Sequence, residues 1–215
     1  FRAFFIKKKR LIPLAISDII AREFSQLYQL PLIDVIYNGR AEVKPTPLLE
    51  DTKKEIERNK KDKNTKVFIA VGRISAQKNH SLLVDTFLDL EKQEENVILL
   101  IIGHDYGIGL LEKNLAVKSP NTYFLGSKNN VSDYLLCSDV FCMSSIYEGL
   151  PISILEALSA SLPVISTEVG GIKDIIKEEA NGFLVDSFDT KSYLKAIEKV
   201  LSLSKEEIDK VKKEN

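Results

Sequence analysis

Short apolar runs alternate with longer amphipathic stretches from residue 66 to residue 203. Continuous apolar runs are typical of strands buried on both faces of a parallel sheet, and the amphipathic stretches between them are typical of crossover helices. The predicted strands are Lys66–Val71, Val97–Ile102, Thr122–Leu125, Val140–Met143, Pro163–Ser166 and Gly182–Val185. The predicted helices are His80–Leu90, Val131–Cys137, Ile152–Ala160, Ile172–Lys177 and Thr190–Leu203. This alternation predicts an α/β fold: a Rossmann-like, doubly wound parallel sheet.

The chain before residue 66 has a different composition. Residues 40–65 contain Pro45 and Pro47, and seven basic and five acidic residues fall between Glu50 and Lys66. Such a segment is typical of a hinge or linker, and its Thr52-Lys53-Lys54-Glu55 sequence predicts a short helix that begins with a capping box.

The two ends of the chain carry their own signals. Strands are predicted over residues 11–16 and 33–37, with a helix capped by Ser17 between them. A second capping box, formed by residues 204–207, predicts a final helix. The basic run at residues 7–10 fits a solvated segment better than a membrane-surface patch. Because Phe1 is not an initiator residue, we expect a fragment of a longer protein.

Two glutamates, Glu148 and Glu156, bracket a strand-to-helix turn marked by Gly149 and Pro151. Glu148 is therefore expected at the carboxyl end of a strand, where open α/β sheets bind ligands. Glu156 is expected about one turn into the next helix, where its carboxylate could accept hydrogen bonds from a vicinal diol such as a ribose. The N–H groups that open this helix suit a phosphate.

Two cations follow the first predicted strand of the domain. Arg73 comes directly after Gly72, and Lys78 lies at the mouth of the next helix. When a nucleoside diphosphate leaves a sugar, negative charge develops on its β-phosphate, and a site for this reaction needs cations there. Arginine can bind phosphate oxygens through two N–H groups, and lysine adds a point charge. Taken alone, the two residues would be read as solvated surface cations.

Composition excludes some classes of function. Lys and Arg number 30 against 31 Asp and Glu, which gives a net charge of −1 and no field that favours nucleic acid. No apolar run approaches the roughly 20 residues that span a bilayer. Cys137 and Cys142 are interpreted as buried thiols. His80 and His104 are not spaced as ligands and are interpreted as ordinary polar residues.

The order of these motifs resembles that of family 4 glycosyltransferases, which are retaining enzymes of the GT-B fold. The resemblance covers about residues 66 to 200. Its motifs are Gly72-Arg73 with Lys78-Asn79, Ile101-Ile102-Gly103, Phe124-Leu125-Gly126, Glu148 with Glu156, Pro163–Thr167, Val169-Gly170-Gly171 and Asn181–Val185. It implies that residues 66–215 are the C-terminal, nucleotide-sugar-binding domain, that residues 1–39 end the N-terminal acceptor-binding domain, and that residues 40–65 join them. One departure lies at residues 103–109, where many members have Gly-x-Gly-Pro.

The resemblance also implies roles for individual residues. Arg73, Lys78 and Glu148 would be catalytic, and Glu156 would hold the ribose. The main chain of Gly149 and Leu150 would bind the diphosphate. Val131, which is equally well explained by helix packing, would border the base together with Gly126-Ser127. The implied donor-binding set is Gly72, Arg73, Lys78, Gly103, Gly126, Ser127, Val131, Glu148, Gly149, Leu150 and Glu156.

The implied function is transfer of a hexose from a nucleoside diphosphate sugar to a glycan or lipid-linked acceptor in cell-surface polysaccharide synthesis. No cofactor is implied, and since the chain has no Asp-x-Asp pair, no donor-site metal is expected. A cytoplasmic location is expected, with peripheral contact at the inner face of the membrane. A non-catalytic sugar-nucleotide-binding or regulatory module remains open, as does a GT-B-like epimerase or phosphorylase. The base, sugar, acceptor, linkage and oligomeric state do not follow from the sequence.

Overall fold

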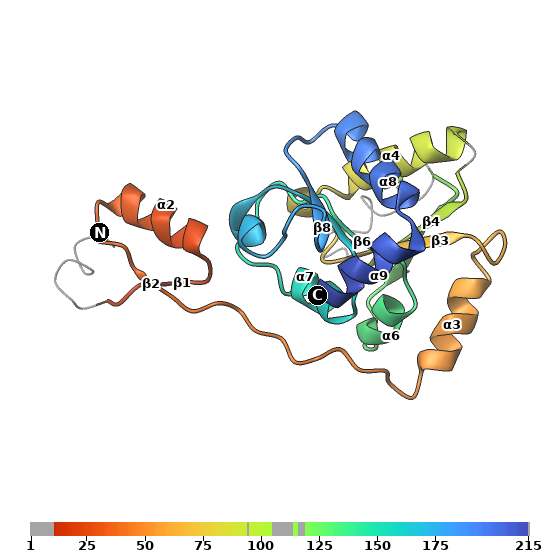
Figure 1. Cartoon of the computed structure of the whole chain (residues 1–215), viewed down its shortest axis with the longest axis horizontal. Helices are drawn as coiled ribbons and strands as arrows, with labels where there is room; N and C mark the ends of the chain where they lie inside the picture. Colours follow the sequence, from red (N-terminus) through yellow and green to blue (C-terminus); the bar gives the residue numbers. More distant parts are fainter. Residues whose placement is uncertain (1–10, 94, 105–113, 116–118, 215) are drawn as a thin grey trace.

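The structure, a computed structural model, describes residues 11–93, 95–104, 114–115 and 119–214. The basic run at residues 7–10 and most of the unusual loop at residues 103–109 lie outside the described residues. Within them, six parallel strands form one sheet in the order β5-β4-β3-β6-β7-β8 (Figure 1). The strands are β3 Lys66–Val71, β4 Val97–Ile102, β5 Thr122–Gly126, β6 Val140–Met143, β7 Val164–Thr167 and β8 Gly182–Val185. The predicted doubly wound α/β fold is confirmed.

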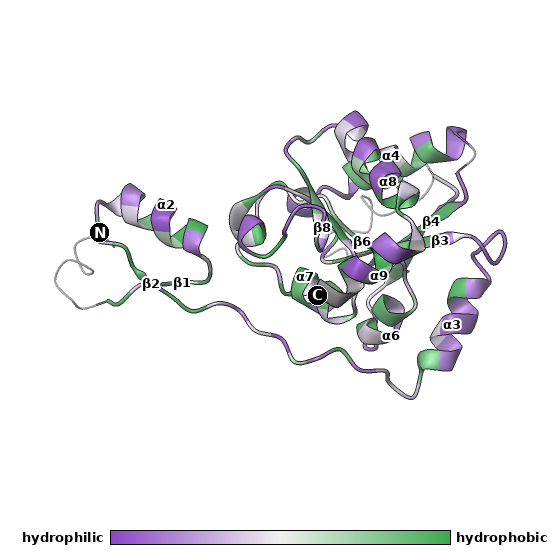
Figure 2. Ribbon diagram, in the orientation of Figure 1, coloured by the Kyte–Doolittle hydropathy of each residue, from purple (hydrophilic) through white to green (hydrophobic). Residues whose placement is uncertain are grey.

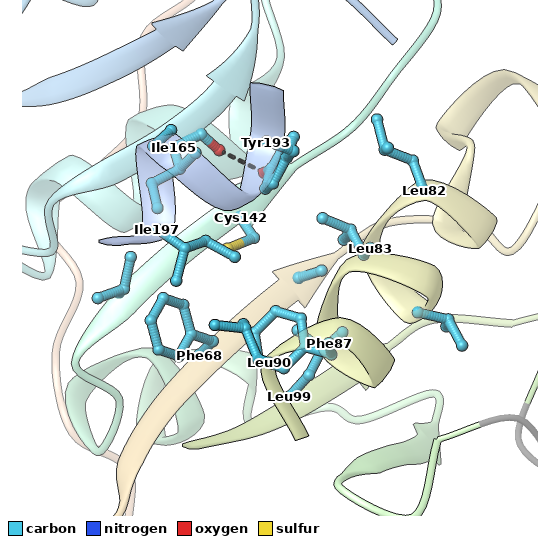
Figure 3. Close-up of a cluster of buried hydrophobic side chains, with 14 of the residues drawn as sticks. Phe68, Leu82, Leu83, Phe87, Leu90, Leu99, Cys142, Ile165, Tyr193 and Ile197 are labelled. Carbon is cyan, nitrogen blue, oxygen red and sulfur yellow. Dashed lines mark hydrogen bonds between the residues drawn. The ribbon is translucent and has the colours of Figure 1, made fainter. Parts of the chain in front are cut away.

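Helices cover both faces of this sheet. Alternate residues of each strand point to opposite sides, and since these strands are apolar on both sides, each face carries its own apolar cluster. On one face, α4 (His80–Lys92) and α8 (Thr190–Ser202) pack on the sheet through the apolar cluster drawn in Figure 3. On the other face, α3 (Leu49–Glu57), α6 (Val131–Leu136) and α7 (Ile152–Ser159) contribute to a second apolar cluster. Figure 2 shows hydrophobic residues concentrated in the strands, whereas α3 is largely hydrophilic.

The strand order reverses between β3 and β6, which are adjacent although β4 and β5 intervene in the sequence. At such a point the connections leave toward opposite faces, and a crevice opens outside the carboxyl ends of the two strands. The segments that follow β3 and β6 carry the predicted cations and Glu148. The fold therefore brings these predicted site residues to the crevice.

A small βαβ unit precedes the main sheet. Its strands, β1 (Leu14–Ala15) and β2 (Asp34–Val35), pair in parallel and flank α2 (Asp18–Tyr28). Ser17 caps α2 as predicted, since its Oγ accepts the N–H of Ile20 at 3.2 Å. Both strands are shorter than predicted because each pairs only with the other among the described residues.

Residues 38–46, which we call the strap, run in extended form from this unit toward α3 (Figure 1). The strap is held against α7 and α6 and the turn before α7 rather than standing free. Its contacts join Asn38 to the carbonyl of Leu150, Arg40 to Glu156, the N–H of Val43 to Ser159, and Thr46 to Asp133. These polar tethers come from points spread along its length, so its path over the domain is fixed.

The predicted start of α3 is wrong. The helix begins at Leu49 rather than after Thr52, which is buried inside it. The preceding chain already forms a turn, in which the N–H of Leu49 donates to the carbonyl of Thr46 at 3.1 Å. Thr52 instead accepts a hydrogen bond from Asn130 at 2.9 Å. The second capping box is confirmed, because Ser204 and Glu207 exchange backbone and side-chain hydrogen bonds at the start of α9 (Lys205–Glu214).

The predicted helix at residues 172–177 is also wrong. The structure has a 3₁₀ helix, η2 (Gly170–Asp174), followed by an irregular turn. Isoleucine spacing predicted the helix, but Gly170 has a φ of 54° and packs against the turn before α7, which fixes the start of η2. The side chain of Asn181 then bonds the N–H of Lys177 and the carbonyl of Ile175, which ends the helical path.

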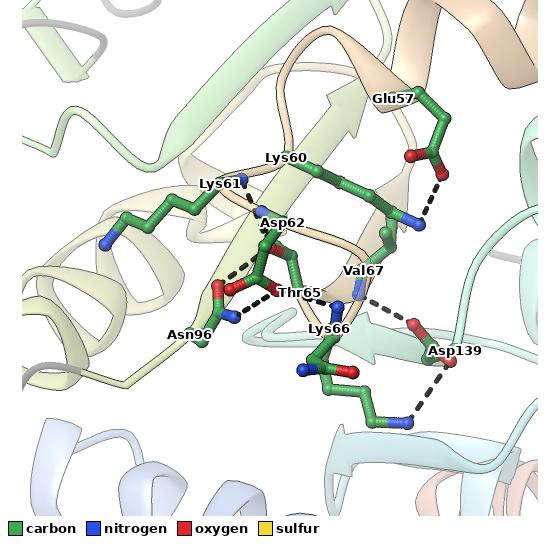
Figure 4. A network of polar contacts seen from close by, with 10 residues as sticks. Glu57, Lys60, Lys61, Asp62, Thr65, Lys66, Val67, Asn96 and Asp139 are labelled. Carbon is green, nitrogen blue, oxygen red and sulfur yellow. Dashed lines mark hydrogen bonds and ion pairs between the residues drawn. The ribbon is translucent and has the colours of Figure 1, made fainter.

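At the amino end of the sheet, a polar network closes the turn before β3 (Figure 4). Asp62 accepts hydrogen bonds from the N–H of Asn64 and from Asn96, and Thr65 donates to Asn96 at 2.7 Å. Asp139 accepts the N–H of Val67 at 2.8 Å. This network lies at the end of the sheet opposite the crevice. No helix in the described part of the chain is long and apolar enough to cross a membrane.

Candidate functional site

Three of the predicted glycines lie side by side at the carboxyl edge of the sheet. Gly72 N–H donates to Ile102 at 3.0 Å, and Gly103 N–H donates to the carbonyl of Gly126 at 3.0 Å. A Cβ on Gly103 would lie 1.8 Å from the carbonyl oxygen of Gly72. Gly126 has a φ of 65°, in the left-handed region that favours glycine. The glycines therefore let the ends of β3, β4 and β5 approach closely.

Lys78 lies across this edge at the end of the 3₁₀ helix η1 (Ala76–Lys78). Its Cε lies 3.2 Å from the position that a Cβ of Gly72 would occupy, so the lysine stem runs over that glycine. Ser144, after β6, donates to the carbonyls of Lys78 and Asn79 at 2.9 Å each. These contacts tie the segment after β3 to the segment after β6.

Lys78 and Glu148 form an ion pair across the crevice. The Nζ–Oε1 distance is 2.7 Å, and the side chains are 15% and 9% exposed. An ammonium has three donor hydrogens, and a carboxylate has about four acceptor positions, so each group can bind a second partner without losing the first. Arg73, next to Gly72, is exposed. The sequence predicted that Lys78 and Glu148 follow strand ends; the structure brings them together as a pair, which was not expected.

The turn from Glu148 to Leu150 is held from behind by η2. Gly171 N–H donates to the carbonyl of Gly149 at 2.8 Å, and a Cβ on Gly170 would lie 2.0 Å from the carbonyl oxygen of Glu148. Leu150 is buried. Helix α7 begins just beyond, with Pro151 at its N-cap and no side-chain cap. An uncapped helix start carries partial positive charge and N–H donors, which suits an anion.

Glu156 and Val131 border a cavity of about 420 Å³. The strap forms one wall and the start of α6 another; the lining residues are Arg40, Ala41, Glu42, Val43, Lys44, Asn129, Val131, Ser132, Leu135 and Glu156. This volume falls within the range of small-molecule sites, about 300–1,000 Å³. Ser127, which the prediction placed here, is exposed and does not line the cavity.

Arg40 contacts Glu156 within this cavity. The Nε–Oε1 distance is 2.8 Å, and the side chains are 53% and 17% exposed. Arg40 lies in the predicted linker, for which no role in the site was expected. Its position directly after Asn38-Gly39, at a predicted strand end, was the one signal that could have drawn attention to it.

His80 lies beneath the crevice at the start of α4. It is buried, and burial together with the nearby charge of Lys78 lowers the pKa of its imidazole from 6.5 to about 4. The ring is therefore neutral near pH 7. Its Nδ1 has no hydrogen-bond partner among the described residues.

The cysteines have no partner for a disulfide. Cys137 and Cys142 are both free thiols. Cys142 is buried as predicted, and burial raises its pKa to about 12, whereas Cys137 is only half-buried. In the described ranges, no three His, Cys, Asp or Glu side chains gather into a group that could hold a metal ion.

Comparison with known proteins identifies the family of this chain. The family described as glycosyl transferases group 1 matches residues 51–215. A relative in Escherichia coli, UDP-Gal:alpha-D-GlcNAc-diphosphoundecaprenol alpha-1,3-galactosyltransferase, is 31% identical over 183 residues, which are 81% of this chain and 47% of the relative. The chain thus spans about half the length of this curated relative.

Solved structures show the same fold. Anabaena HepE in complex with UDP and glucose gives a TM-score of 0.76 at 20% identity, covering 93% of this chain and 55% of that protein. The C-terminal domain of a group 1 family protein (LpcC) from Francisella tularensis gives a TM-score of 0.63 at 18% identity, covering 80% of this chain and 91% of that domain. The main sheet thus has the fold of the C-terminal domain of GT-B glycosyltransferases. With the family match over residues 51–215, the chain belongs to the glycosyl transferases group 1 family.

Proposed function

We propose that this chain is the donor-binding half of a retaining glycosyltransferase of family 4. The donor is a nucleoside diphosphate hexose. The acceptor is a glycan or lipid-linked saccharide of cell-surface polysaccharide synthesis, held by a second domain outside these residues. The protein acts in the cytoplasm, where a lipid-linked acceptor would bring it to the inner face of the membrane.

One observation carries this proposal: Lys78 and Glu148 meet at the crevice between β3 and β6, beside the uncapped start of α7. In the proposal, a diphosphate lies beside the glycine-rich strand ends, next to the stem of Lys78. The cavity that contains Glu156 lies on the same side, at the second turn of α7. A diphosphate at the crevice and a nucleoside in the cavity would therefore be continuous parts of one ligand.

The chemistry assigned to these residues follows from charge. As the bond between the anomeric carbon and the β-phosphate oxygen breaks, the diphosphate gains negative charge and the sugar becomes oxocarbenium-like. Arg73, Lys78 and the N–H groups of Gly149 and Leu150 stabilise the leaving group. Glu148, which pairs with Lys78 through Oε1 and leaves Oε2 outside that pair, contacts the sugar and stabilises its positive charge. The new bond to the acceptor oxygen forms on the face that the diphosphate leaves, and the departing diphosphate takes the proton of the acceptor hydroxyl.

The relatives support the substrate class. The Escherichia coli relative is named for UDP-galactose and a diphosphoundecaprenol acceptor, and the HepE structure contains UDP and glucose. These substrates belong to those proteins, and they make uridine diphosphate sugars and lipid-linked acceptors the first candidates to test. No metal or cofactor is part of the proposal, because Arg73, Lys78 and the start of α7 supply positive charge at the diphosphate.

The proposal is tested by incubating the whole protein, with chelator present, with UDP-, GDP- and ADP-hexoses and extracted lipid-linked acceptors. Proton NMR of the product reports the anomeric configuration. Transfer with the donor's configuration retained is expected. Transfer with inversion would contradict the retaining assignment, and a strict need for Mg²⁺ at the donor would contradict the electrostatic one. Tight donor binding with no transfer to any acceptor would favour a non-catalytic sugar-nucleotide-binding module.

A further inference from the structure

Arg40 occupies a position that gives it a part in nucleotide binding. We propose that Arg40 is a positioning residue for Glu156: it holds the carboxylate in place for the ribose of the nucleotide and offsets its charge, with the strap as a built wall of the nucleoside cavity. This inference rests on the proposed function, because it assigns the nucleoside to that cavity. It adds to the donor site a residue from outside the main sheet domain.

The strap is fixed on both sides of Arg40. Asn38 donates to the carbonyl of Leu150 at 2.9 Å, and the N–H of Val43 donates to Ser159 Oγ at 2.8 Å. The Cα of Arg40 is therefore anchored to the turn before α7 on one side and to the end of α7 on the other. An arginine carried on an anchored backbone loses less entropy in forming its ion pair than one on a free linker.

The contact leaves Glu156 able to bind a ligand. The ion pair joins Arg40 Nε to Oε1 of Glu156 at 2.8 Å. A carboxylate has about four acceptor positions, so Oε2 and a lone pair of Oε1 can still accept hydrogen bonds from the ribose hydroxyls. Arg40 therefore does not have to leave when the nucleotide binds. An ion pair at one oxygen fixes the side chain so that the other oxygen points in a defined direction.

Charge gives Arg40 a second effect. Glu156 is a mostly buried carboxylate, and the proposed diphosphate site lies at the start of the same helix. Without a partner, its negative charge would oppose the arrival of a diphosphate. Arg40 cancels that charge. Lys44 also lines the cavity, but its ammonium pairs with Glu42 in an exposed position.

The test is a thermodynamic cycle that combines a change in the protein with a change in the ligand. Binding of UDP, GDP and ADP to residues 1–215 is measured by calorimetry, and the tightest ligand is compared with its 2′-deoxy analogue. Wild-type protein is expected to bind the ribonucleotide about tenfold more tightly, the value of one charge-assisted hydrogen bond. In Arg40→Gln this preference is expected to disappear because Glu156 is no longer held. A purely structural role would weaken both ligands equally and leave the preference intact.

Matched variants complete the design. Arg58→Gln removes an exposed arginine from the end of α3 and is expected to leave the 2′-hydroxyl preference unchanged. Arg40→Lys keeps the charge but not the geometry of the Nε contact. Compared with Arg40→Gln, it is expected to bind both nucleotides more tightly but to recover less of the preference for the ribonucleotide. A full 2′-hydroxyl preference in Arg40→Gln overturns the inference while leaving the proposed function standing. If wild-type protein binds none of the three nucleotides, the inference about Arg40 and the proposed function are both contradicted.

Discussion

The two ends of the candidate site are built differently. At the proposed phosphate end, around Lys78 and Glu148, the main chains at the ends of the strands pack closely against one another. The ion pair of Lys78 and Glu148 there is nearly buried. At the nucleoside end, a tethered strap lies over α7 and α6, and the arginine of its ion pair is half exposed. The phosphate end is thus part of the core of the fold, whereas the nucleoside end can vary without disturbing the sheet. Substitutions should therefore cost more at the first than at the second.

Close backbone packing gives the largest expected difference. In Gly103→Ala the new Cβ would lie 1.8 Å from a backbone oxygen, which forces the ends of β3 and β4 apart. We expect a loss of about 3 kcal/mol in unfolding free energy, the upper end of the usual cost of overpacking. Gly39→Ala in the strap is the control, since nothing lies within 4 Å of its Cβ. Urea unfolding of both variants checks the comparison, and equal small changes would contradict it.

The second largest difference is expected in catalysis, where substitutions at the two ends should affect different kinetic constants. In the whole enzyme, Lys78→Ala or Arg73→Ala is expected to lower kcat about 100-fold, the loss typical of removing one preorganised charge stabiliser. Glu156→Ala is expected mainly to raise KM, because the proposed bonds of Glu156 to the ribose would be alike in the ground and transition states. Lys195→Ala, on the exposed face of α8, serves as the control. Similar small effects from all of these variants would remove the distinction between a catalytic and a binding end.

The phosphate end should also respond to mild acid. The buried imidazole of His80 has its pKa lowered to about 4, so below pH 6.5 the unfolded chain binds a proton that the folded chain does not. Above pH 6.5, His80 does not reduce the free energy of unfolding. As the pH drops from 6.5 toward 4 this free energy falls, by about 2 kcal/mol at pH 5. His80→Gln should lack this dependence. The measurement is unfolding by urea at pH 7 and pH 5, and parallel losses in the two proteins would exclude His80 as the cause.

The nucleoside end should respond only at lower pH and more weakly. Burial alone would raise the pKa of the Asp133 carboxyl, but hydrogen bonds from Thr46 and Asn130 outweigh it and leave the pKa below its ordinary 3.8. The hydrogen bonds of Thr46 to the Asp133 carboxylate are therefore fully stabilising above pH 3.8, and they weaken as the pH falls through the lowered pKa. At pH 7, Asp133→Asn should reduce the protection of the Thr46 amide against hydrogen exchange about tenfold, or about 1.4 kcal/mol.

In this exchange experiment, Ser187→Ala is the control, because it removes a hydroxyl that donates to Asp189 far from the strap. Unchanged protection of Thr46 in Asp133→Asn would show that the strap is held by its other contacts. Protection in the wild-type protein that is lost already at pH 5 would contradict the lowered pKa of Asp133.

Sequence reasoning was most successful where burial is continuous. The bounds of β3, β4, β6 and β8 were predicted to the residue, since an unbroken apolar run reports a strand covered on both faces. It failed at η2, where isoleucine spacing favoured a helix but the close contact of Gly170 with the carbonyl of Glu148 decided the backbone. That contact joins residues distant in the sequence, so local spacing carried no sign of it.

The site shows the same limit. Gly72, Lys78 and Glu148 could each be assigned to the segment after a strand, and the carboxyl ends of parallel strands lie on one side of the sheet. The partner of Glu156 could not be found in this way. Arg40 lies in a stretch whose prolines and charges resemble a free linker, and only the tertiary tethers of the strap bring its guanidinium to the carboxylate. Whether each predicted residue binds the donor stays a prediction.

Amide NMR during titration with UDP, GDP and ADP tests most directly that a nucleoside diphosphate binds at the carboxyl edge. The account predicts that one nucleotide shifts the amide signals of Gly72, Gly103, Gly149 and Leu150 and of the strap. It also predicts that the network around Asp62 and Asn96, at the opposite edge of the sheet, does not respond. Saturable shifts confined to that opposite edge, or no shifts with any of the three nucleotides, would contradict it.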